Sequence, residues 1–169
     1  MTIGLMSRKE KIVTEVEIFD SISDCPVIIQ DLMQSAHQIR QKAYAPYSNF
    51  FVGAAILLED GTVVTGSNQE NASYPAGLCA ERTALFYAGA HYPDLKIESM
   101  ALTAGPKDEN NLSPVPPCGS CRQAIAEYEQ KQKSPIAVYF MGKSGQVKKV
   151  DSLLSLLPLA FDKAFLKAD

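Results

Sequence analysis

The sequence predicts an α/β fold in which helices cover a mixed β-sheet. Asp60-Gly61 lies between two apolar runs, a pattern that favours a tight turn between antiparallel strands. Beyond this hairpin, stretches with the apolar spacing of helices alternate with short apolar runs that are typical of buried strands. The order is hairpin, helix, strand, helix, strand, strand. This order implies antiparallel and parallel strand pairs in one sheet, with helices packed against it.

The elements up to the hairpin follow from local patterns. Residues 14–19 alternate polar and apolar side chains, as a strand does. Residues 25–48 contain a helix that ends before Pro46. Residues 50–67 hold the hairpin, with one strand on each side of the turn. The apolar side chains expected on the core face of the helix are Ile28, Ile29, Leu32, Met33, Ala36 and Ile39.

The elements after the hairpin are predicted from the same periodicities and from turn residues. We expect helices at 78–90 and 118–130, strands at 97–104, 135–141 and 146–150, a polar proline-rich loop at 107–117, and an amphipathic helix or turn at 151–161. The last strand is short and is expected at an edge of the sheet.

The composition suits one domain, residues 1–169, with 46% hydrophobic and 21% charged residues. The formal net charge is −3, whereas nucleic-acid binders usually carry a basic face, so a nucleic-acid partner is not expected. No apolar run approaches the ~20 residues of a membrane helix, and no membrane partner is expected. We therefore expect a cytoplasmic protein, in which four cysteines indicate metal binding or catalysis rather than disulfides.

Three cysteines are placed at predicted helix starts. Cys118 and Cys121 are spaced i, i+3, which puts both sulfurs on one face of a helix. Helix N-termini favour thiolate over thiol, because free N–H groups stabilise negative charge. Cys79 lies at the start of an earlier helix. If the two helix starts converge, three thiolates meet, and three thiolates favour zinc.

Zinc prefers four ligands, so the fourth ligand is the next question. Cys25 precedes a different helix, and the simpler interpretation is a small buried cysteine. His37 and His91 both fall on predicted helices among polar neighbours, as surface histidines do. Water is the remaining candidate, and a position left open to water is typical of a catalytic zinc site.

Glu81 distinguishes a catalytic metal from a structural one. Residues i and i+2 do not face each other on a regular helix, so Cys79 should lie at or before the first helical residue. Glu81 could then relay protons of a water molecule beside the metal, and Arg82 could offset the thiolate charge. The alternative is that Glu81 only matches the helix dipole. The cysteine pair downstream favours catalysis.

The sequences CAER (79–82) and PCGSCRQ (117–123) closely resemble those of the cytidine deaminases, specifically the short-chain homotetrameric class within the cytidine and deoxycytidylate deaminase superfamily. The resemblance extends to YAPYSNFFVGAAIL (44–57), NQENASYPAGLCAERTA (68–84) and LLPLAF (156–161). It covers residues 32–161 and departs from the short family pattern in two places. These are the N-terminal extension, residues 1–24, where a strand is expected to be added, and a long loop at 106–116.

The resemblance implies a three-layer α-β-α fold with a mixed five-stranded sheet, and one zinc ion per subunit. It implies that Cys79, Cys118 and Cys121 bind zinc, that Glu81 is the general acid and base, and that Arg82 donates hydrogen bonds to cysteine sulfurs. For the substrate it implies contacts of five further residues and the backbone of Ala80: Asn68 and Glu70 with the ribose, Phe50 stacked on the pyrimidine, Ala80 at the polar edge of the base, and Tyr74 and Phe161 entering the site of a neighbouring subunit.

The implied activity is hydrolytic deamination of cytidine and 2′-deoxycytidine to uridine and 2′-deoxyuridine, in pyrimidine salvage. Three alternatives stay open. One is a deaminase of a modified cytosine nucleoside, such as a blasticidin-type antibiotic. Another is a non-enzymatic zinc module, which predicts a closed site that includes Cys25. A polynucleotide deaminase is the third, and the negative net charge and the ribose loop argue against it.

Overall fold

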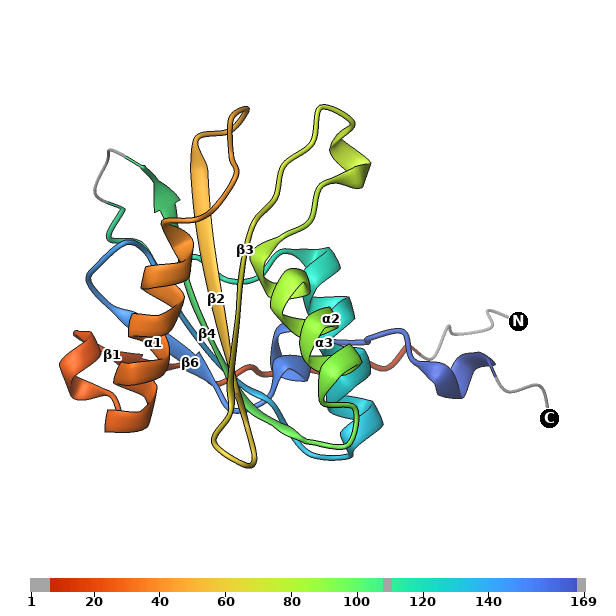
Figure 1. Cartoon of the computed structure of the whole chain (residues 1–169). Helices are drawn as coiled ribbons and strands as arrows, with labels where there is room; N and C mark the ends of the chain where they lie inside the picture. The colour runs from red at the N-terminus through yellow and green to blue at the C-terminus, as the bar shows by residue number, and fades with distance from the viewer. Residues whose placement is uncertain (1–6, 108–110, 167–169) are drawn as a thin grey trace, which may run out of the picture.

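In the computed structural model, residues 7–107 and 111–166 are described (Figure 1). They form a six-stranded sheet in the order β1-β6-β5-β4-β2-β3. All neighbouring strands are antiparallel except β4 and β5, which are parallel. The strands are β1 (Glu17–Phe19), β2 (Phe50–Leu58), β3 (Val63–Ser67), β4 (Ile97–Pro106), β5 (Ala137–Met141) and β6 (Val147–Val150). The predicted mixed sheet is confirmed: five strands correspond to β2–β6, and β1 is the strand of the N-terminal extension.

Three α-helices make the outer layers. One face of the sheet is covered by α1 (Val27–Arg40), and the other by α2 (Ala80–His91) and α3 (Gly119–Gln132) (Figure 1). Each face has its own apolar core, so the sheet is buried on both sides. This explains why β4 reads as a nearly continuous apolar run rather than an alternating one.

The core face of α1 differs from the prediction at both of its ends. Ile28 is 54% exposed, because it lies in the first turn on the side away from the sheet. Ile39 is only half-buried, whereas its neighbour Arg40 is 2% exposed. The Arg40 guanidinium donates to the carbonyls of Phe51, Gly105 and Pro106 over 2.6–2.9 Å. A buried charge is stable here because these carbonyls replace the hydrogen bonds of water.

The hairpin forms as predicted, with Gly61 in the left-handed region at φ 87° between β2 and β3. Gly66 in β3 allows α2 to pack directly on the sheet, since a Cβ atom at this position would lie 2.5 Å from the backbone nitrogen of Ala84. This contact sets the depth of α2 relative to β2 and β3. It therefore also sets the position of the residues at the start of α2.

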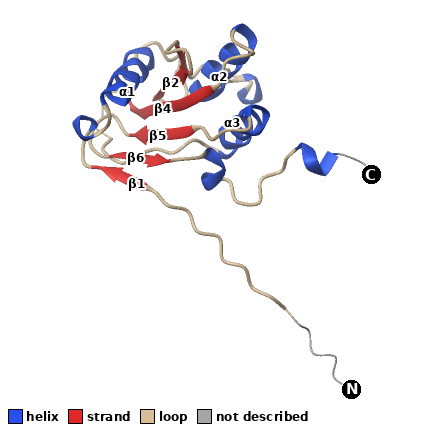
Figure 2. Cartoon of the chain, turned by 90° about the horizontal axis from the view of Figure 1, so that it is seen from below, coloured by secondary structure: helices blue, strands red, loops and turns tan. Residues whose placement is uncertain are grey.

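One prediction about the C-terminal third is wrong. β6 is not an edge strand, because β1 pairs with it (Figure 2). Lys149 of β6 also forms ion pairs with Glu17 and Asp151 at 2.9 and 2.8 Å. Residues 151–161, where a helix or turn is expected, hold a short 3-10 helix, Leu153–Leu156. Ser152 caps this turn by accepting from the backbone N–H of Leu154, and Pro158 prevents a longer helix.

Within residues 7–107 and 111–166, no helix is both long and apolar enough to cross a membrane.

Candidate functional site

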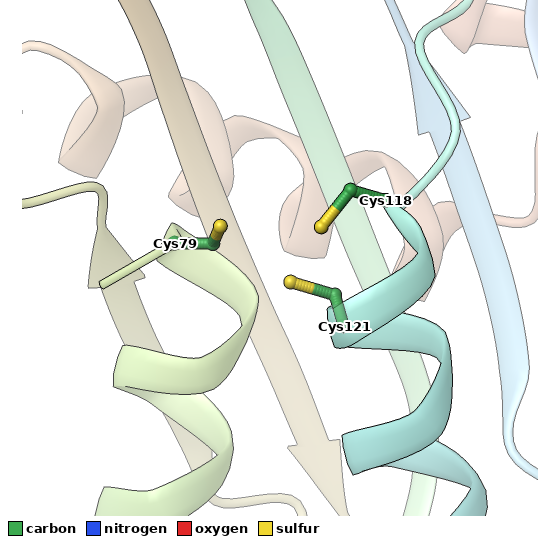
Figure 3. Close-up of side chains that lie close together, drawn as sticks. All are labelled: Cys79, Cys118 and Cys121. Carbon is green, nitrogen blue, oxygen red and sulfur yellow. The ribbon is translucent and has the colours of Figure 1, made fainter. Parts of the chain in front are cut away.

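The starts of α2 and α3 lie side by side and bring three thiols together (Figure 3). Cys79 is the N-cap of α2, Cys118 is the N-cap of α3, and Cys121 lies in the first turn of α3. Their sulfur atoms all lie within 4.8 Å of one another. The predicted convergence of two helix starts is confirmed.

The three sulfurs fit a zinc ion. Tetrahedral zinc with Zn–S bonds of about 2.3 Å would hold sulfurs about 3.8 Å apart, within the separation found here. Nη2 of Arg82 donates to Sγ of Cys79 at 3.5 Å, so a cation offsets thiolate charge as expected. Nε of Arg82 is buried and has no hydrogen-bond partner among the residues that the structure describes. The three cysteine side chains and Arg82 are therefore all consistent with a charged group, such as a zinc ion, bound between the sulfur atoms.

Cys79 and Cys121 are coupled in their protonation, and Cys79 is the one that loses its proton more easily. The pKa of Cys79 is lowered to about 5 by its hydrogen bond with Cys121, with a further contribution from Arg82. The pKa of Cys121 is raised, because the Cys79 thiolate is beside it and because Cys121 is buried. The two thiols thus share a proton, and zinc would displace it because the metal binds thiolate.

Cys25 does not belong to this group. It is 5% exposed and packs with Ile29, Leu32 and Tyr139 in the core on the α1 side of the sheet. In the described part of the chain, no further histidine, cysteine or carboxylate joins the three thiols. Three protein ligands leave one tetrahedral position for water or substrate, as in catalytic zinc sites, and the closed four-cysteine arrangement is not formed.

Glu81 lies in the first turn of α2 and is 5% exposed. With Cys79 and Cys118 it lines a cavity of about 320 Å³. Burial raises the pKa of the Glu81 carboxyl, and the negative Cys79 thiolate adds to this effect. A carboxyl with a raised pKa can both accept and donate a proton near neutral pH. Ala80, between Cys79 and Glu81, is fully buried.

The same cavity is also lined by Phe50, Asn68 and Glu70. The amide of Asn68 is held by β2, since Oδ1 accepts from the backbone N–H of Val52 and Nδ2 donates to the carbonyl of Phe50. Glu70 accepts from the backbone N–H groups of Tyr47 and Ser48, and from the Ser48 hydroxyl. Two of the three thiols and these polar side chains therefore line one cavity.

Sequence reasoning missed Ser48, which also lines the cavity. Its only signal was its position in the YAPYSNF stretch, and nothing local relates that stretch to Glu70. Phe50 and its neighbour Phe51 are separated by the pleat of β2, because successive side chains point to opposite faces. Phe50 lines the cavity, and the ring of Phe51 lies 6.0 Å from Nζ of Lys107 outside it.

Two of the predicted substrate-binding residues, Tyr74 and Phe161, do not line the cavity that contains Glu81 of the same chain. Tyr74 is 74% exposed and lines an adjoining hollow of about 480 Å³, which also includes Glu70 and Cys79. Phe161 is 56% exposed and stacks on Phe165 with ring centroids 5.8 Å apart. Both rings are therefore available to contacts outside the subunit.

The chain matches known proteins over most of its length. Residues 27–136 match the family model described as the cytidine and deoxycytidylate deaminase zinc-binding region. The chain is 42% identical over 132 residues to a cytidine deaminase of Halalkalibacterium halodurans, covering 78% of this chain and 92% of that protein. It is 39% identical to a cytidine deaminase of Sporosarcina psychrophila, covering 80% and 92%.

The fold matches solved structures of the same kind. A crystal structure of a cytidine deaminase from Burkholderia pseudomallei superimposes with a TM-score of 0.66 at 41% identity, covering 78% of this chain and 97% of that chain. A cytidine deaminase from Mycobacterium tuberculosis gives a TM-score of 0.62 at 31% identity, covering 81% and 99%.

Proposed function

The chain belongs to the cytidine and deoxycytidylate deaminase family, and on this premise we propose that it deaminates cytidine and 2′-deoxycytidine by hydrolysis, with one zinc ion per subunit. The products are uridine, 2′-deoxyuridine and ammonia. The observation that carries the proposal is one cavity whose walls hold two of the three clustered thiols, Cys79 and Cys118, the buried Glu81 carboxyl, and polar side chains suited to a nucleoside.

Cys79, Cys118 and Cys121 would hold the zinc ion, and Arg82 would offset part of their negative charge. Zinc, when bound, supplies Lewis-acid activation of a water molecule. Glu81 takes a proton from that water at its carboxylate and delivers it to nitrogen 3 of the cytosine ring. A second proton passes through the same carboxyl to the departing amino group. The pKa of Glu81, raised by burial, suits this alternation, because burial makes the carboxyl a better proton acceptor than an exposed one.

The remaining residues orient the nucleoside. Asn68 and Glu70 bind the ribose hydroxyls, Phe50 stacks on the pyrimidine ring, and the backbone of Ala80 binds the polar edge of the base. Support comes from the place of Asn68, Glu70 and Phe50 on the walls of the cavity that Cys79, Glu81 and Cys118 also line, and from the position of Ala80 between Cys79 and Glu81 in sequence. The walls also include Leu102, Ala104 and Val115, whose apolar side chains exclude water from the reacting ring.

The active enzyme is proposed to be a homotetramer in which Tyr74 and Phe161 complete the site of a neighbouring subunit. Support comes from exposed apolar side chains that a single chain does not cover. Leu159, Phe161, Phe165 and Leu166 are 92%, 56%, 70% and 72% exposed. Sedimentation of the purified protein should give four times the subunit mass, and a monomer with full activity would contradict this assembly. A cytoplasmic location is proposed because three catalytic thiols need a reducing compartment.

The test of the proposed function is the loss of cytidine ultraviolet absorbance with purified protein, before and after zinc removal by a chelator. We expect conversion to uridine, loss of conversion after chelation, and recovery when zinc is added back. Measured zinc content should follow activity. A folded, zinc-loaded protein that leaves cytidine and 2′-deoxycytidine unchanged would contradict the proposal, and modified cytosine nucleosides would then be tested as substrates.

A further inference from the structure

We propose that Ser48 is a positioning residue that holds the Glu70 carboxylate for ribose binding and thereby sets the affinity for the nucleoside. This inference rests on the proposed function and adds a residue to which that function assigns no role. Ser48 and Glu70 line both the cavity beside Glu81 and the adjoining hollow. They are separated by 22 positions in sequence and joined by hydrogen bonds.

The direction of the hydrogen bonds at Ser48 is determined by its neighbours. The backbone N–H of Phe50 donates to Oγ of Ser48 at 3.0 Å. A backbone N–H can only donate, so the hydroxyl must accept there, and its one proton remains available for another group. That proton goes to Oε1 of Glu70, which as a carboxylate can only accept. The chain of donors therefore runs one way, from Phe50 through Ser48 to Glu70.

The other carboxylate oxygen is held as well. Oε2 of Glu70 accepts from the backbone N–H groups of Tyr47 and Ser48 at 2.9 and 3.3 Å. A carboxylate has about four acceptor positions, so three bonds leave roughly one for a substrate hydroxyl. The Ser48 hydroxyl occupies one acceptor position of Oε1 of Glu70 and thus decides which position of that oxygen stays available to a substrate hydroxyl. It also couples the ribose residue to the backbone of Phe50, the residue proposed to stack on the base.

Removal of the hydroxyl should affect binding rather than chemistry. Glu70 is only partly buried, and its long side chain would gain rotational freedom without Ser48. That freedom must be lost again when a nucleoside binds, which weakens affinity. Protons move at Glu81, which has no hydrogen bond with Ser48 or Glu70, so the rate of the bound complex should change little.

The chain offers a matched control. Ser152 donates its hydroxyl proton to Oε1 of Glu129, in the same kind of serine–glutamate contact. Ser152 lies next to the 3-10 helix Leu153–Leu156 and does not line either cavity beside the thiols. Ser152→Ala therefore removes an equivalent hydroxyl with no expected effect on nucleoside binding.

The experiment compares steady-state kinetics with cytidine for the zinc-loaded wild type, Ser48→Ala, Ser48→Thr and Ser152→Ala. We expect Ser48→Ala to raise KM roughly tenfold with kcat within about twofold. Ser48→Thr keeps a hydroxyl and should hold KM within about threefold of wild type. Ser152→Ala should leave KM unchanged. A Ser48→Ala KM equal to that of wild type would overturn the proposal, as would an equal loss in Ser48→Thr and Ser48→Ala.

A double-mutant cycle tests whether Ser48 acts through Glu70. Glu70→Ala alone should raise KM, and adding Ser48→Ala should raise it little further, because the group that Ser48 positions is already absent. Fully additive effects on KM would overturn the proposal. A wild-type enzyme that does not convert cytidine would instead contradict the proposed function itself, so the two failures can be distinguished.

Discussion

Glu70 and Glu129 accept hydrogen bonds from the same kinds of donor group, but the two carboxylates lie in different surroundings. Each carboxylate accepts from one serine hydroxyl and from two backbone N–H groups. Glu70 stands at the wall of the candidate active site, where water and substrate reach it. Glu129 is 5% exposed and ties the end of α3 to the segment before β5 and to the 3-10 helix Leu153–Leu156. The motif is therefore the same, and burial separates the proposed ribose-binding group, Glu70, from a structural one, Glu129.

The two glutamates differ in which group can accept the same hydrogen bonds once the carboxylate is removed. Around Glu129, the N–H groups of Ile136 and Leu153 donate over 2.9 and 2.8 Å in a site closed to solvent. If the carboxylate were removed, each of these buried N–H groups would lack an acceptor and would lower the free energy of unfolding by about 1–3 kcal/mol. Around Glu70, water can take the place of the carboxylate, so stability depends on it much less. Five variants, in four comparisons, test this contrast.

The largest effect is expected at a third glutamate, Glu81, which is buried like Glu129 but lies in the cavity like Glu70. Glu81→Gln keeps the volume of the side chain and removes its ability to carry a proton. We expect turnover to fall by roughly 10²–10⁴-fold, the usual contribution of a general acid and base. Cytidine conversion and zinc content are measured together. Retained turnover in a zinc-loaded variant would show that another group moves the protons.

Glu129→Ala should have the largest effect on stability. Two buried N–H groups and the Ser152 hydroxyl lose their acceptor, and the free energy of unfolding should fall by roughly 4 kcal/mol. Denaturant unfolding at fixed protein concentration measures this loss. Below the unfolding transition, KM for cytidine should equal that of the wild type. A stable variant with a raised KM would reverse the assignment of the two glutamates.

Glu70→Ala should show the opposite pattern. We expect kcat/KM for cytidine to fall about 30-fold, mostly through KM, while the unfolding midpoint stays close to that of the wild type. The matched comparison is Glu70→Ala against Glu129→Ala in the same two assays. The contrast between the regions fails if Glu70→Ala unfolds as easily as Glu129→Ala.

The smallest difference is expected between the two serines. Ser152→Ala leaves Oε1 of the buried Glu129 without its hydroxyl donor and should lower the free energy of unfolding by about 1 kcal/mol. Ser48→Ala affects an exposed contact, and its loss of stability should be less than half as large. Thermal unfolding of both variants at one protein concentration checks this order. Equal losses would indicate that both hydroxyls have the same structural role.

Local sequence patterns predicted the parts of this protein that depend on nearby residues. The turn at Asp60-Gly61, the helix starts at Cys79 and Cys118, and the i, i+3 spacing of Cys118 and Cys121 are short-range features. The three-thiol group followed from two such starts and one assumption, that they converge. The predictions that failed concern long-range packing, such as the exposed Ile28 and the half-buried Ile39.

The sequence by itself determined the elements, the three thiols and the carboxyl beside them, because periodicity, turn residues and helix starts act over a few residues. Tertiary structure alone decided that β1 covers β6, that Cys25 lies on the other side of the sheet, and that Ser48 reaches Glu70. Tertiary structure alone also decided that Glu129 is buried and that Glu70 lies at a cavity wall. A side chain's partners and its access to water come from residues far away in sequence, and no local pattern records them.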